Sequence, residues 1–515
     1  MSPETTSTLK SRGWVRLLIA FVVAFDVAAF FQWADGAFQS EFGGHPDEAT
    51  HYLTGLRARD AALHTWDRTH PGEVHHPVAA LRRTPAFDVA QGAWMLIFGT
   101  SRLAALLFMA ALAAATATLM FGIVRREFGD WAAFAAALLW LCAPAVRESY
   151  ETILPEQFGA FLFTGAALLW ARVMDARGRS GALPTSAEVQ SAAPVPDASN
   201  QRQAPACRLI CALALLGGGG VLAHTLAVAL EIAPGDPRAA WFFLKECVSV
   251  PGIAVVVFAI AGVVIRRRSD ARLGTVWVAM IVLVAGVLFA RWTKAGVPDV
   301  RVLIVAAPAL AMLAVRGAVS LAGIVGSQTA IAHERSRRAA LWCLLLLLLA
   351  LPADLLSHRE KDWQGFGPIA LTLVEESRGP ARVLVVSDPR GEGMLISEIA
   401  MRDLARQITI ERGSETLADS AGSAPRGKPQ ERFIEDELLF AHLTDGRIRY
   451  IVLDSAVPEE SHAGYHDQVR RIIEGNVRSF WPISDSPIIR DGEPQGHPLR
   501  IFRVMKPDGV ELQLQ

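Results

Sequence analysis

The chain has 515 residues, 52% of them hydrophobic, and a mean hydropathy of +0.30, which excludes a soluble protein of normal composition. Its formal charge is −1, so no global positive field favours a nucleic-acid partner. Charged residues are sparse in the apolar runs before Ser357 and dense after it. This segregation predicts a transmembrane domain over residues 1–357 and a small α/β domain over residues 358–515.

Long apolar runs recur through the first domain. A hydrocarbon core takes about 20 apolar residues per helix, and by that measure the chain has about nine transmembrane helices. The predicted spans are Trp14–Trp33, Arg102–Val124, Trp131–Val146, Pro155–Val173, Arg208–Leu230, Val248–Ile265, Leu273–Ala290, Val302–Leu321 and Ala340–Leu356. The first run is too long for a signal-peptide core and no small-residue cleavage site follows it, so we expect a retained helix. Residues 175–206, rich in Gly, Ser, Ala and Pro, are expected to form a flexible cytoplasmic linker.

Arginine clusters alternate between the loops and predict the orientation of the chain. If the N-terminus is cytoplasmic, the basic clusters lie in the inner loops, as the positive-inside rule requires. These clusters include Arg125–Arg126, Arg266–Arg268 and Arg337–Arg338. An odd number of crossings then places both the first loop and the C-terminal domain outside. We therefore expect a multi-pass membrane protein with a cytoplasmic N-terminus and a C-terminal domain on the outer side of the membrane.

An acidic pair follows the first span, in the segment Gly44-His-Pro-Asp-Glu-Ala-Thr-His51. Asp47 is the candidate general base, and Glu48 is a candidate orienting residue, second carboxylate or metal ligand. Consecutive helical residues point about 100° apart, so one carboxylate should address the substrate while the other supports it. The alternative is that both are interfacial charges capping a short helix, with Pro46 in its first turn.

This loop resembles the first exoplasmic loop of the GT-C fold membrane glycosyltransferases, which include protein O-mannosyltransferases and aminoarabinose transferases. An Asp-Glu pair near the end of the first helix is the most recognisable mark of these enzymes. The resemblance extends to Gly99-Thr-Ser-Arg-Leu103, where the second span begins, and to the late segment Arg301–Pro308. It implies a GT-C-like membrane domain and a polyprenyl- or dolichyl-phosphate-sugar donor. It also implies that Asp47, as the first acidic residue, is the essential one.

Basic residues at the outer membrane boundary are candidates for contact with the donor phosphate. Arg301 precedes the eighth predicted span, where the resemblance implies an arginine or lysine on that phosphate, and Lys294 lies shortly before it. Arg82 and Arg83 are further candidates, because guanidinium groups bind phosphate oxygens in a bidentate manner. For these arginines the alternative is a routine anchor at the membrane interface.

Two further groups of residues are candidates for the site. Glu148, Glu151 and Glu156 follow the third span on the same predicted face, where the family commonly has a second acidic position; solvated loop charges are the alternative. His51 lies one helical turn beyond Asp47. That spacing is compatible with a divalent metal or with a simple hydrogen-bonded pair. The pattern thus leaves a divalent metal open and assigns no other cofactor.

The second domain alternates strand-like and helical segments. Strands are expected at Arg382–Asp388, Ile408–Glu411, Ile448–Leu453 and Arg500–Val504, with helices at Glu392–Arg406, Phe433–Leu443 and His462–Glu474. This alternation favours a small, mostly parallel sheet with helices on both faces. The turn from Asp388 to Gly393 carries only part of a nucleotide-binding fingerprint, so a plain strand-to-helix turn is favoured over a phosphate site.

Together these features favour a membrane glycosyltransferase that moves a hexosyl or pentosyl group from a polyprenyl-phosphate carrier to an exoplasmic glycan, lipid or protein. One alternative is a transporter or flippase of a lipid-linked glycan intermediate. Such a protein should show inverted repeats or paired broken helices, and neither is apparent in the sequence. The other alternative is a non-catalytic envelope-assembly protein with a GT-C-like shell.

Overall fold

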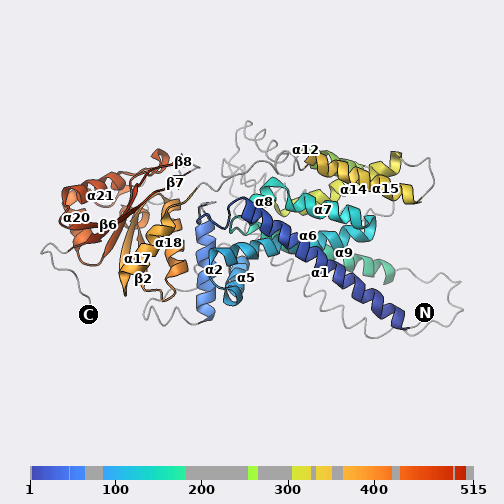
Figure 1. Ribbon diagram of the computed structural model, residues 1–515, viewed down its shortest axis with the longest axis horizontal. Helices are drawn as coiled ribbons and strands as arrows, with labels where there is room; N and C mark the ends of the chain where they lie inside the picture. Colours follow the sequence, from blue (N-terminus) through green and yellow to red (C-terminus); the bar gives the residue numbers. More distant parts are fainter. Residues whose placement is uncertain are drawn as a thin grey trace. The chain divides into compact units, whose positions relative to one another are not determined.

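The protein is described from a computed structural model that covers residues 3–43, 45, 47–63, 85–180, 253–264, 304–325, 332–350, 363–419, 430–490 and 493–505 (Figure 1). The chain divides into two compact units. The first comprises Met1–Phe31 and Leu107–His358, and the second comprises Gln32–Leu106 and Arg359–Gln515. The second unit thus joins the loop that follows the first span to the C-terminal sheet.

Apolar helices make up the described part of the first unit. Two helices are long and apolar enough to cross a membrane: Trp14–Ala34 within α1 (Pro3–Ala34) and α6 (Arg102–Phe128), each with a mean hydropathy of 2.1. A third candidate is α7 (Asp130–Leu141) with α8 (Pro144–Tyr150), bent by 65° at the break between them. The other helices are α9 (Glu156–Ser180), α12 (Ile253–Val264), α14 (Ala307–Val325) and α15 (Ala332–Ala350).

The described residues therefore contain two or three candidate spans, and the predicted count of about nine is not confirmed. Two of the predicted spans, Arg208–Leu230 and Leu273–Ala290, lie outside the described residues. So does most of the expected linker, although α9 continues to Ser180 and includes its first residues.

Small residues allow α12 and α14 to pack closely. A Cβ atom on Gly262 would lie 2.2 Å from the Leu313 carbonyl oxygen, and one on Gly317 would lie 2.0 Å from the Phe258 carbonyl oxygen. The two backbones therefore touch where these glycines cross. Such contacts are typical of membrane helices, whose association depends on close van der Waals packing.

The C-terminal sheet has five strands in the order β2-β1-β5-β9-β6. The strands β1 (Ala381–Val386), β2 (Ile408–Arg412) and β5 (Tyr450–Asp454) are parallel, whereas β9 (Leu499–Val504) pairs antiparallel with β5 and with β6 (Phe480–Ser486). The predicted sheet was mostly parallel, and this part of the prediction was wrong. A mixed sheet results because β6 and β9 form an antiparallel edge.

Helices cover both faces of the sheet, as predicted. On one face, α20 (Asp436–Thr444) and α21 (Gly464–Gly475) contribute Leu439, Leu443, Val469 and Ile473 to a buried apolar core. On the opposite side lie α17 (Phe366–Ser377) and α18 (Pro389–Arg402) (Figure 1). Short elements complete the domain: α19 (Gly413–Thr416), β3 (Ala418–Asp419), β4 (Gln430–Glu431), a 3₁₀ turn (Glu459–Ser461), β7 (Ile489–Arg490) and β8 (Glu493–Pro494).

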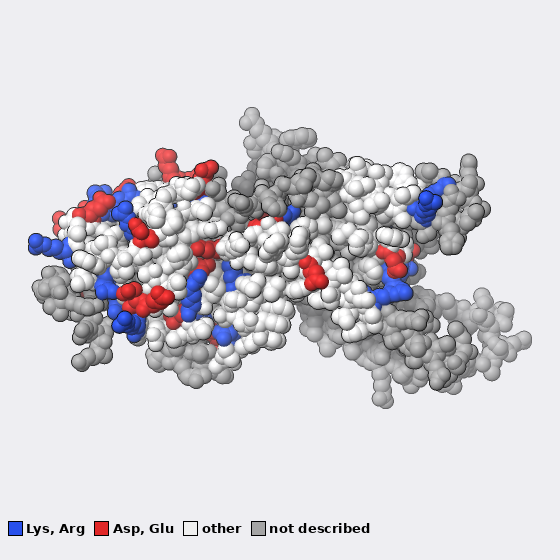
Figure 2. Space-filling model, viewed as in Figure 1, with Lys and Arg blue, Asp and Glu red and all other residues white. Residues whose placement is uncertain are grey.

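Charge is segregated in the structure as it is in the sequence. In Figure 2, acidic and basic side chains gather over the C-terminal sheet and its helices, whereas the described surface of the apolar helices is mostly uncharged. That uncharged surface includes exposed Trp131, Phe134, Val257 and Leu348. Large apolar side chains facing outward along helices are expected where lipid is the surrounding solvent.

Candidate active site

Asp47 lies directly before the first residue of α2 (Glu48–Ala62). Its side chain is 51% exposed, and its Oδ2 atom is 3.9 Å from His45 Nδ1. The Asp47 backbone N–H donates to the same ring nitrogen at 3.0 Å. Asp47 occupies the N-cap position of α2, yet its side chain makes no capping hydrogen bond. The Asp47 carboxylate is therefore accessible to a bound molecule and does not cap the helix.

Glu48, in contrast, is fully buried. Arg102, the first residue of α6, donates from Nη2 to Glu48 Oε1 at 3.1 Å. The same guanidinium donates to the carbonyl oxygens of Ser40, at 2.6 Å, and Ala37, and it lies over the Phe42 ring. The two consecutive carboxylates thus have different surroundings, since Asp47 precedes the helix and is half-exposed whereas Glu48 is its first residue and is buried.

His51 faces a second buried carboxylate. Its Nδ1 atom lies 3.7 Å from Asp88 Oδ1 on α5 (Pro85–Phe98), and its ring meets the Phe87 ring edge-on. Within the described part of the chain, no group of three or more His, Cys, Asp or Glu side chains is arranged to hold a metal ion. The Asp47–His51 metal pair stays a prediction.

The second acidic cluster lies in the first unit and has mixed surroundings. Arg147 Nε donates to Glu151 Oε1 at 3.3 Å, and both side chains are buried. The Arg147 guanidinium also lies over the Phe31 ring, 4.7 Å from its centroid. Glu148 is exposed on α8, and Glu156 begins α9. Glu151 is therefore held in an ion pair, and Glu148 is the most accessible of the three.

The four basic candidates for the donor phosphate, Arg82, Arg83, Lys294 and Arg301, lie outside the described residues. Their assignment to the donor phosphate therefore remains a prediction from the sequence.

Sequence reasoning missed two glutamates in the second unit, of which Glu41 is partly buried and Glu392 is fully buried. Glu41 accepts the backbone N–H groups of Gly365, Phe366 and Gly367, at 3.1, 2.8 and 2.7 Å. Burial, and secondarily the nearby carboxylate of Glu398, raises the pKa of Glu41 to about 7. No local pattern marks this residue, because its partners lie more than 300 positions along the chain.

The other missed carboxyl group is Glu392, in the first turn of α18. Burial raises its pKa to about 7, against the opposing effect of hydrogen bonds from Ser414. The Ser414 backbone N–H donates to Glu392 Oε1 at 2.9 Å, and the Ser414 hydroxyl donates to Oε2. Glu392 thus joins α18 to the segment that follows β2.

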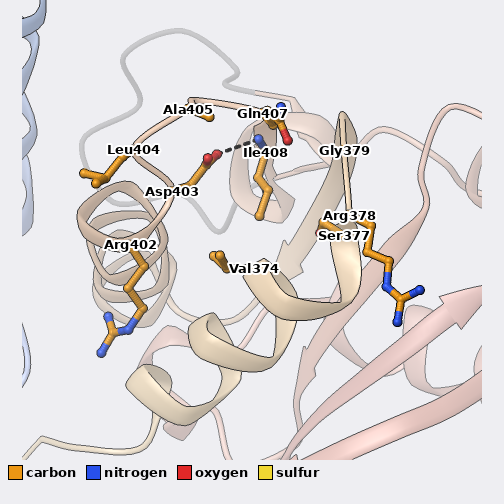
Figure 3. Close-up of a pocket in the computed structure, with 10 residues that line it drawn as sticks. All are labelled: Val374, Ser377, Arg378, Gly379, Arg402, Asp403, Leu404, Ala405, Gln407 and Ile408. Atoms are coloured by element: carbon orange, nitrogen blue, oxygen red, sulfur yellow. Dashed lines mark hydrogen bonds between the residues drawn. The ribbon is translucent and has the colours of Figure 1, made fainter.

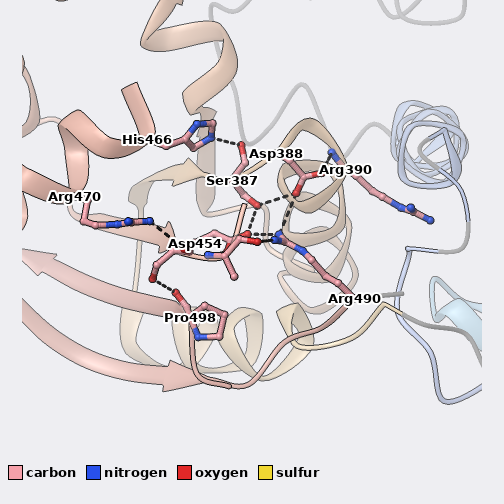
Figure 4. Close-up of polar contacts among 10 residues, drawn as sticks. Ser387, Asp388, Arg390, Asp454, His466, Arg470, Arg490 and Pro498 are labelled. Atoms are coloured by element: carbon pink, nitrogen blue, oxygen red, sulfur yellow. Dashed lines mark hydrogen bonds and ion pairs between the residues drawn. The ribbon is translucent and has the colours of Figure 1, made fainter. Parts of the chain in front are cut away.

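A buried polar cluster lies at the carboxyl ends of β1 and β5 (Figure 4). The Ser387 hydroxyl donates to Asp454 Oδ2 at 2.6 Å. Arg490 donates to Asp454 and, at 3.1 Å, to Asp388. His466 Nε2 lies 3.1 Å from the Ser387 carbonyl oxygen, and burial lowers the pKa of this histidine. Open α/β sheets bind ligands at this switch point, but here the buried Arg490 side chain fills it.

The turn after β1 is a packed strand-to-helix connection. The Asp388 carboxylate accepts the Arg390 backbone N–H at 3.3 Å and so caps α18. A Cβ atom on Gly391 would lie 2.3 Å from Ser387 Oγ, and one on Gly393 would lie 3.2 Å from Ala49 Cβ. Both glycines therefore serve close packing within the protein, which agrees with the plain turn favoured by the sequence.

A cavity of about 250 Å³ lies at the opposite end of the sheet, beside the final residues of α17 and α18 (Figure 3). The Asp403 carboxylate is engaged there by the Ile408 backbone N–H at 2.7 Å. The guanidinium groups of Arg378 and Arg402 point away from the space (Figure 3). Few polar groups converge on the cavity, so it is a weaker candidate than the Asp47 loop.

A family model described as dolichyl-phosphate-mannose-protein mannosyltransferase matches residues 76–187. The matched segment contains α5 to α9 and the three glutamates of the second acidic cluster, and it begins after Asp47 and Glu48. No curated protein matches the chain. The family match confirms the resemblance to GT-C fold glycosyltransferases that the sequence suggested. Together with the apolar helices, it indicates a membrane glycosyltransferase that uses a lipid-linked sugar donor.

Proposed function

We propose that the protein transfers a sugar from a polyprenyl-phosphate carrier to a hydroxyl group of an exoplasmic glycan, lipid or protein, with Asp47 as the general base. The observation that carries this proposal is the contrast within the acidic pair. Asp47 is half-exposed at the start of α2, and Glu48 beside it is buried against Arg102. The family similarity over residues 76–187 supplies the class of donor.

The proposed reaction is a single displacement at the anomeric carbon. The acceptor oxygen forms a bond to that carbon while its proton passes to the Asp47 carboxylate. The bond between the anomeric carbon and the phosphate oxygen breaks, and its electron pair leaves with polyprenyl phosphate. Phosphate is already a good leaving group, so a protonating acid is not needed, unlike in glycoside hydrolysis. Glu48, held by Arg102, orients the first turn of α2.

Cationic side chains would hold the donor phosphate through charge-assisted hydrogen bonds. We assign this role first to Arg301, with Lys294, Arg82 and Arg83 as further contacts. An accessible carboxylate of the second acidic cluster would contribute to acceptor or donor binding, and Glu148 fits this role best because its side chain is exposed whereas Glu151 is buried.

The proposed topology places the N-terminus in the cytoplasm, and the Asp47 loop and the C-terminal domain in the periplasm of a bacterial inner membrane. A reporter that is active only outside the cytoplasm should work when fused after Val504 and fail when inserted near Ser191. A cytoplasmic C-terminus would refute this arrangement, because the acidic loop and the C-terminal sheet form one unit.

The test of function uses the full chain in lipid nanodiscs with radiolabelled sugar on polyprenyl phosphate, beginning with the mannosyl donor. Envelope membranes from a strain lacking the protein supply the acceptor. We expect label to move from the lipid to the acceptor fraction while free polyprenyl phosphate accumulates in equal amount. Matched reactions with a nucleotide-sugar donor should show no transfer.

A parallel assay in sealed vesicles, with the same labelled donor, distinguishes the alternatives. A flippase would move labelled lipid across a vesicle bilayer with the sugar–phosphate bond intact; the bend between α7 and α8 is the feature that favours this reading, since transporters use discontinuous helices. An assembly protein would neither cleave nor move the donor. Either result would replace the proposed function.

A further inference from the structure

We propose that the C-terminal α/β domain holds the Asp47 loop in its working position, with Glu41 and Arg390 as positioning residues. The inference rests on the proposed function, because it assigns the domain a part in that reaction. All the contacts involved lie within the second compact unit.

The first contact lies before Asp47 in the chain. Gly365, at the N-cap position of α17, has no side chain to cap the helix and makes no capping bond. Its φ of +124° favours glycine, and a Cβ atom there would lie 2.3 Å from the Pro487 carbonyl oxygen. Glu41 takes the role of the cap by accepting the first N–H groups of the helix. A carboxylate at a helix N-terminus is also favoured by the helix dipole.

The second contact lies closer to Asp47. Arg390, in the first turn of α18, donates to the Gly43 carbonyl oxygen, and its guanidinium lies 4.0 Å from the centre of the Trp363 ring. Figure 4 shows its side chain extending away from the cluster around Asp454. A Cβ atom on Gly43 would lie 2.4 Å from Trp363 Cβ. The loop backbone therefore lies directly against the domain at this point.

The third contact lies after Asp47, along α2. The Ser397 hydroxyl donates to the Ala49 carbonyl oxygen at 3.4 Å, and Ala49 also packs on Gly393. At the far end of α2, Arg406 Nε donates to Asp60 Oδ2 at 2.9 Å. The domain thus contacts the chain on both sides of Asp47, while the Asp47 carboxylate stays half-exposed.

This arrangement makes the position of a catalytic base depend on a domain that contributes no reacting group. Displacement of a reacting group by about 1 Å typically costs about a hundredfold in rate. Loss of Glu41 or Arg390 should therefore lower kcat while leaving the KM for the donor unchanged, since the proposed donor contacts lie elsewhere. A defect that only reduced the amount of folded protein would lower the number of active sites and leave their kcat unchanged.

The experiment compares Glu41→Ala, Glu41→Gln and Arg390→Ala with wild type in the polyprenyl-phosphate transfer assay, normalised to folded protein. Glu376→Ala is the matched control, because Glu376 lies at the other end of α17 and pairs with Arg503 at 2.6 Å. We expect a loss of about tenfold to a hundredfold in kcat for the two alanine variants at positions 41 and 390. Glu41→Gln, which keeps an acceptor oxygen, should lose less, and Glu376→Ala should match wild type.

An engineered disulfide between α2 and α18 provides the decisive test. A Cβ atom added to Gly393 would lie 3.2 Å from Ala49 Cβ, and the Cβ atoms of a disulfide lie about 3.5–4.5 Å apart. Cysteines at these two positions therefore need a shift of only a few tenths of an ångström to form a disulfide. In the Glu41→Ala background, oxidation of this pair should restore transfer, and reduction should abolish the rescue. The same oxidation without the added cysteines should have no effect on the rate.

Hydrogen exchange provides a readout that does not depend on activity. The first amides of α17 and α2 should exchange faster in Glu41→Ala than in wild type or Glu376→Ala. Wild-type exchange and wild-type kcat in the alanine variants, or a lost kcat that the disulfide does not restore, would overturn the positioning role. Failure of the proposed function has a different signature: wild type would not transfer sugar, or Asp47→Asn would transfer it normally.

Discussion

Among the buried charged residues near the acidic loop, we predict that Arg102 is the one whose replacement lowers the free energy of unfolding most. Its side chain is 6% exposed and pairs with Glu48, which is fully buried. Removing one partner of a buried pair typically costs about 3–5 kcal/mol, because the other charge remains without compensation. Arg102→Met keeps most of the stem but also removes the donor to the Ser40 and Ala37 carbonyl oxygens. We therefore expect a loss near the upper end of that range.

A double-mutant cycle separates the ion pair from the rest of this loss. Replacing both members of a buried pair by apolar residues is often nearly neutral. Adding Glu48→Leu to Arg102→Met should therefore recover part of the lost stability, although each single substitution is destabilising. Arg382→Met is the control, because Arg382 forms a more exposed pair with Glu411 at 2.9 Å. Such exposed pairs contribute about 0–1 kcal/mol.

The assay is equilibrium unfolding of the purified protein in mixed micelles, followed by tryptophan fluorescence and by hydrogen exchange of α2 amides. The cycle gives the coupling free energy between the two positions. The reasoning is refuted if Arg102→Met costs no more than Arg382→Met. It is also refuted if the double variant is no more stable than Arg102→Met alone.

Three further predictions address pH, helix packing and the donor. Glu41 and Glu392 have raised pKa values of about 7 in the folded chain, so both bind a proton more tightly when folded than when unfolded. Their contribution to the free energy of unfolding is therefore fully present below about pH 4.5 and is lost as the pH rises through 7. The loss should be roughly 1 kcal/mol for each group between pH 6 and pH 8. Unfolding at the two pH values measures this, and Glu41→Gln should remove its share. Gly317→Ala should destabilise the first unit by about 1–3 kcal/mol, measured by thermal unfolding, because the new methyl group overlaps the Phe258 carbonyl oxygen. Gly165→Ala is the control and should be tolerated, because the nearest atom to its new methyl group would be 3.9 Å away. Arg301→Ala should raise the KM for donor by about tenfold to a hundredfold, with partial rescue by lysine, and an unchanged donor titration would remove Arg301 from the phosphate site.

The parallel core of the C-terminal domain was predictable because its strands are continuous apolar runs. Residues 381–386 are buried on both faces of the sheet except at one position, and this is the pattern of a central parallel strand. β6 was missed because Pro482 and three polar residues obscure its period. It forms at the edge of the sheet with a register shift near Pro482, where a proline is tolerated.

Long-range contacts explain most of what the sequence did not reveal. α17 has no capping residue of its own, since its cap comes from Glu41. Within the candidate site, the acidic pair was recognisable by its motif, but its two different surroundings were not. Arg102 lies 54 positions after Glu48, and a single sequence carries no pattern that joins the two. The family resemblance included the Gly99–Leu103 segment, but it did not indicate that Arg102 is the residue in it that pairs with Glu48.

The central claim is that Asp47 accepts the acceptor's proton, and single-turnover transfer by Asp47→Asn tests it most directly. Donor-loaded protein in nanodiscs is mixed with acceptor membranes, and the first-order rate of sugar transfer is compared with wild type. Asparagine keeps the shape of the side chain but cannot accept the proton. The rate should therefore fall by about 10²–10⁴-fold, the usual contribution of general-base catalysis, while donor binding persists. Transfer by Asp47→Asn at the wild-type rate would contradict the mechanism.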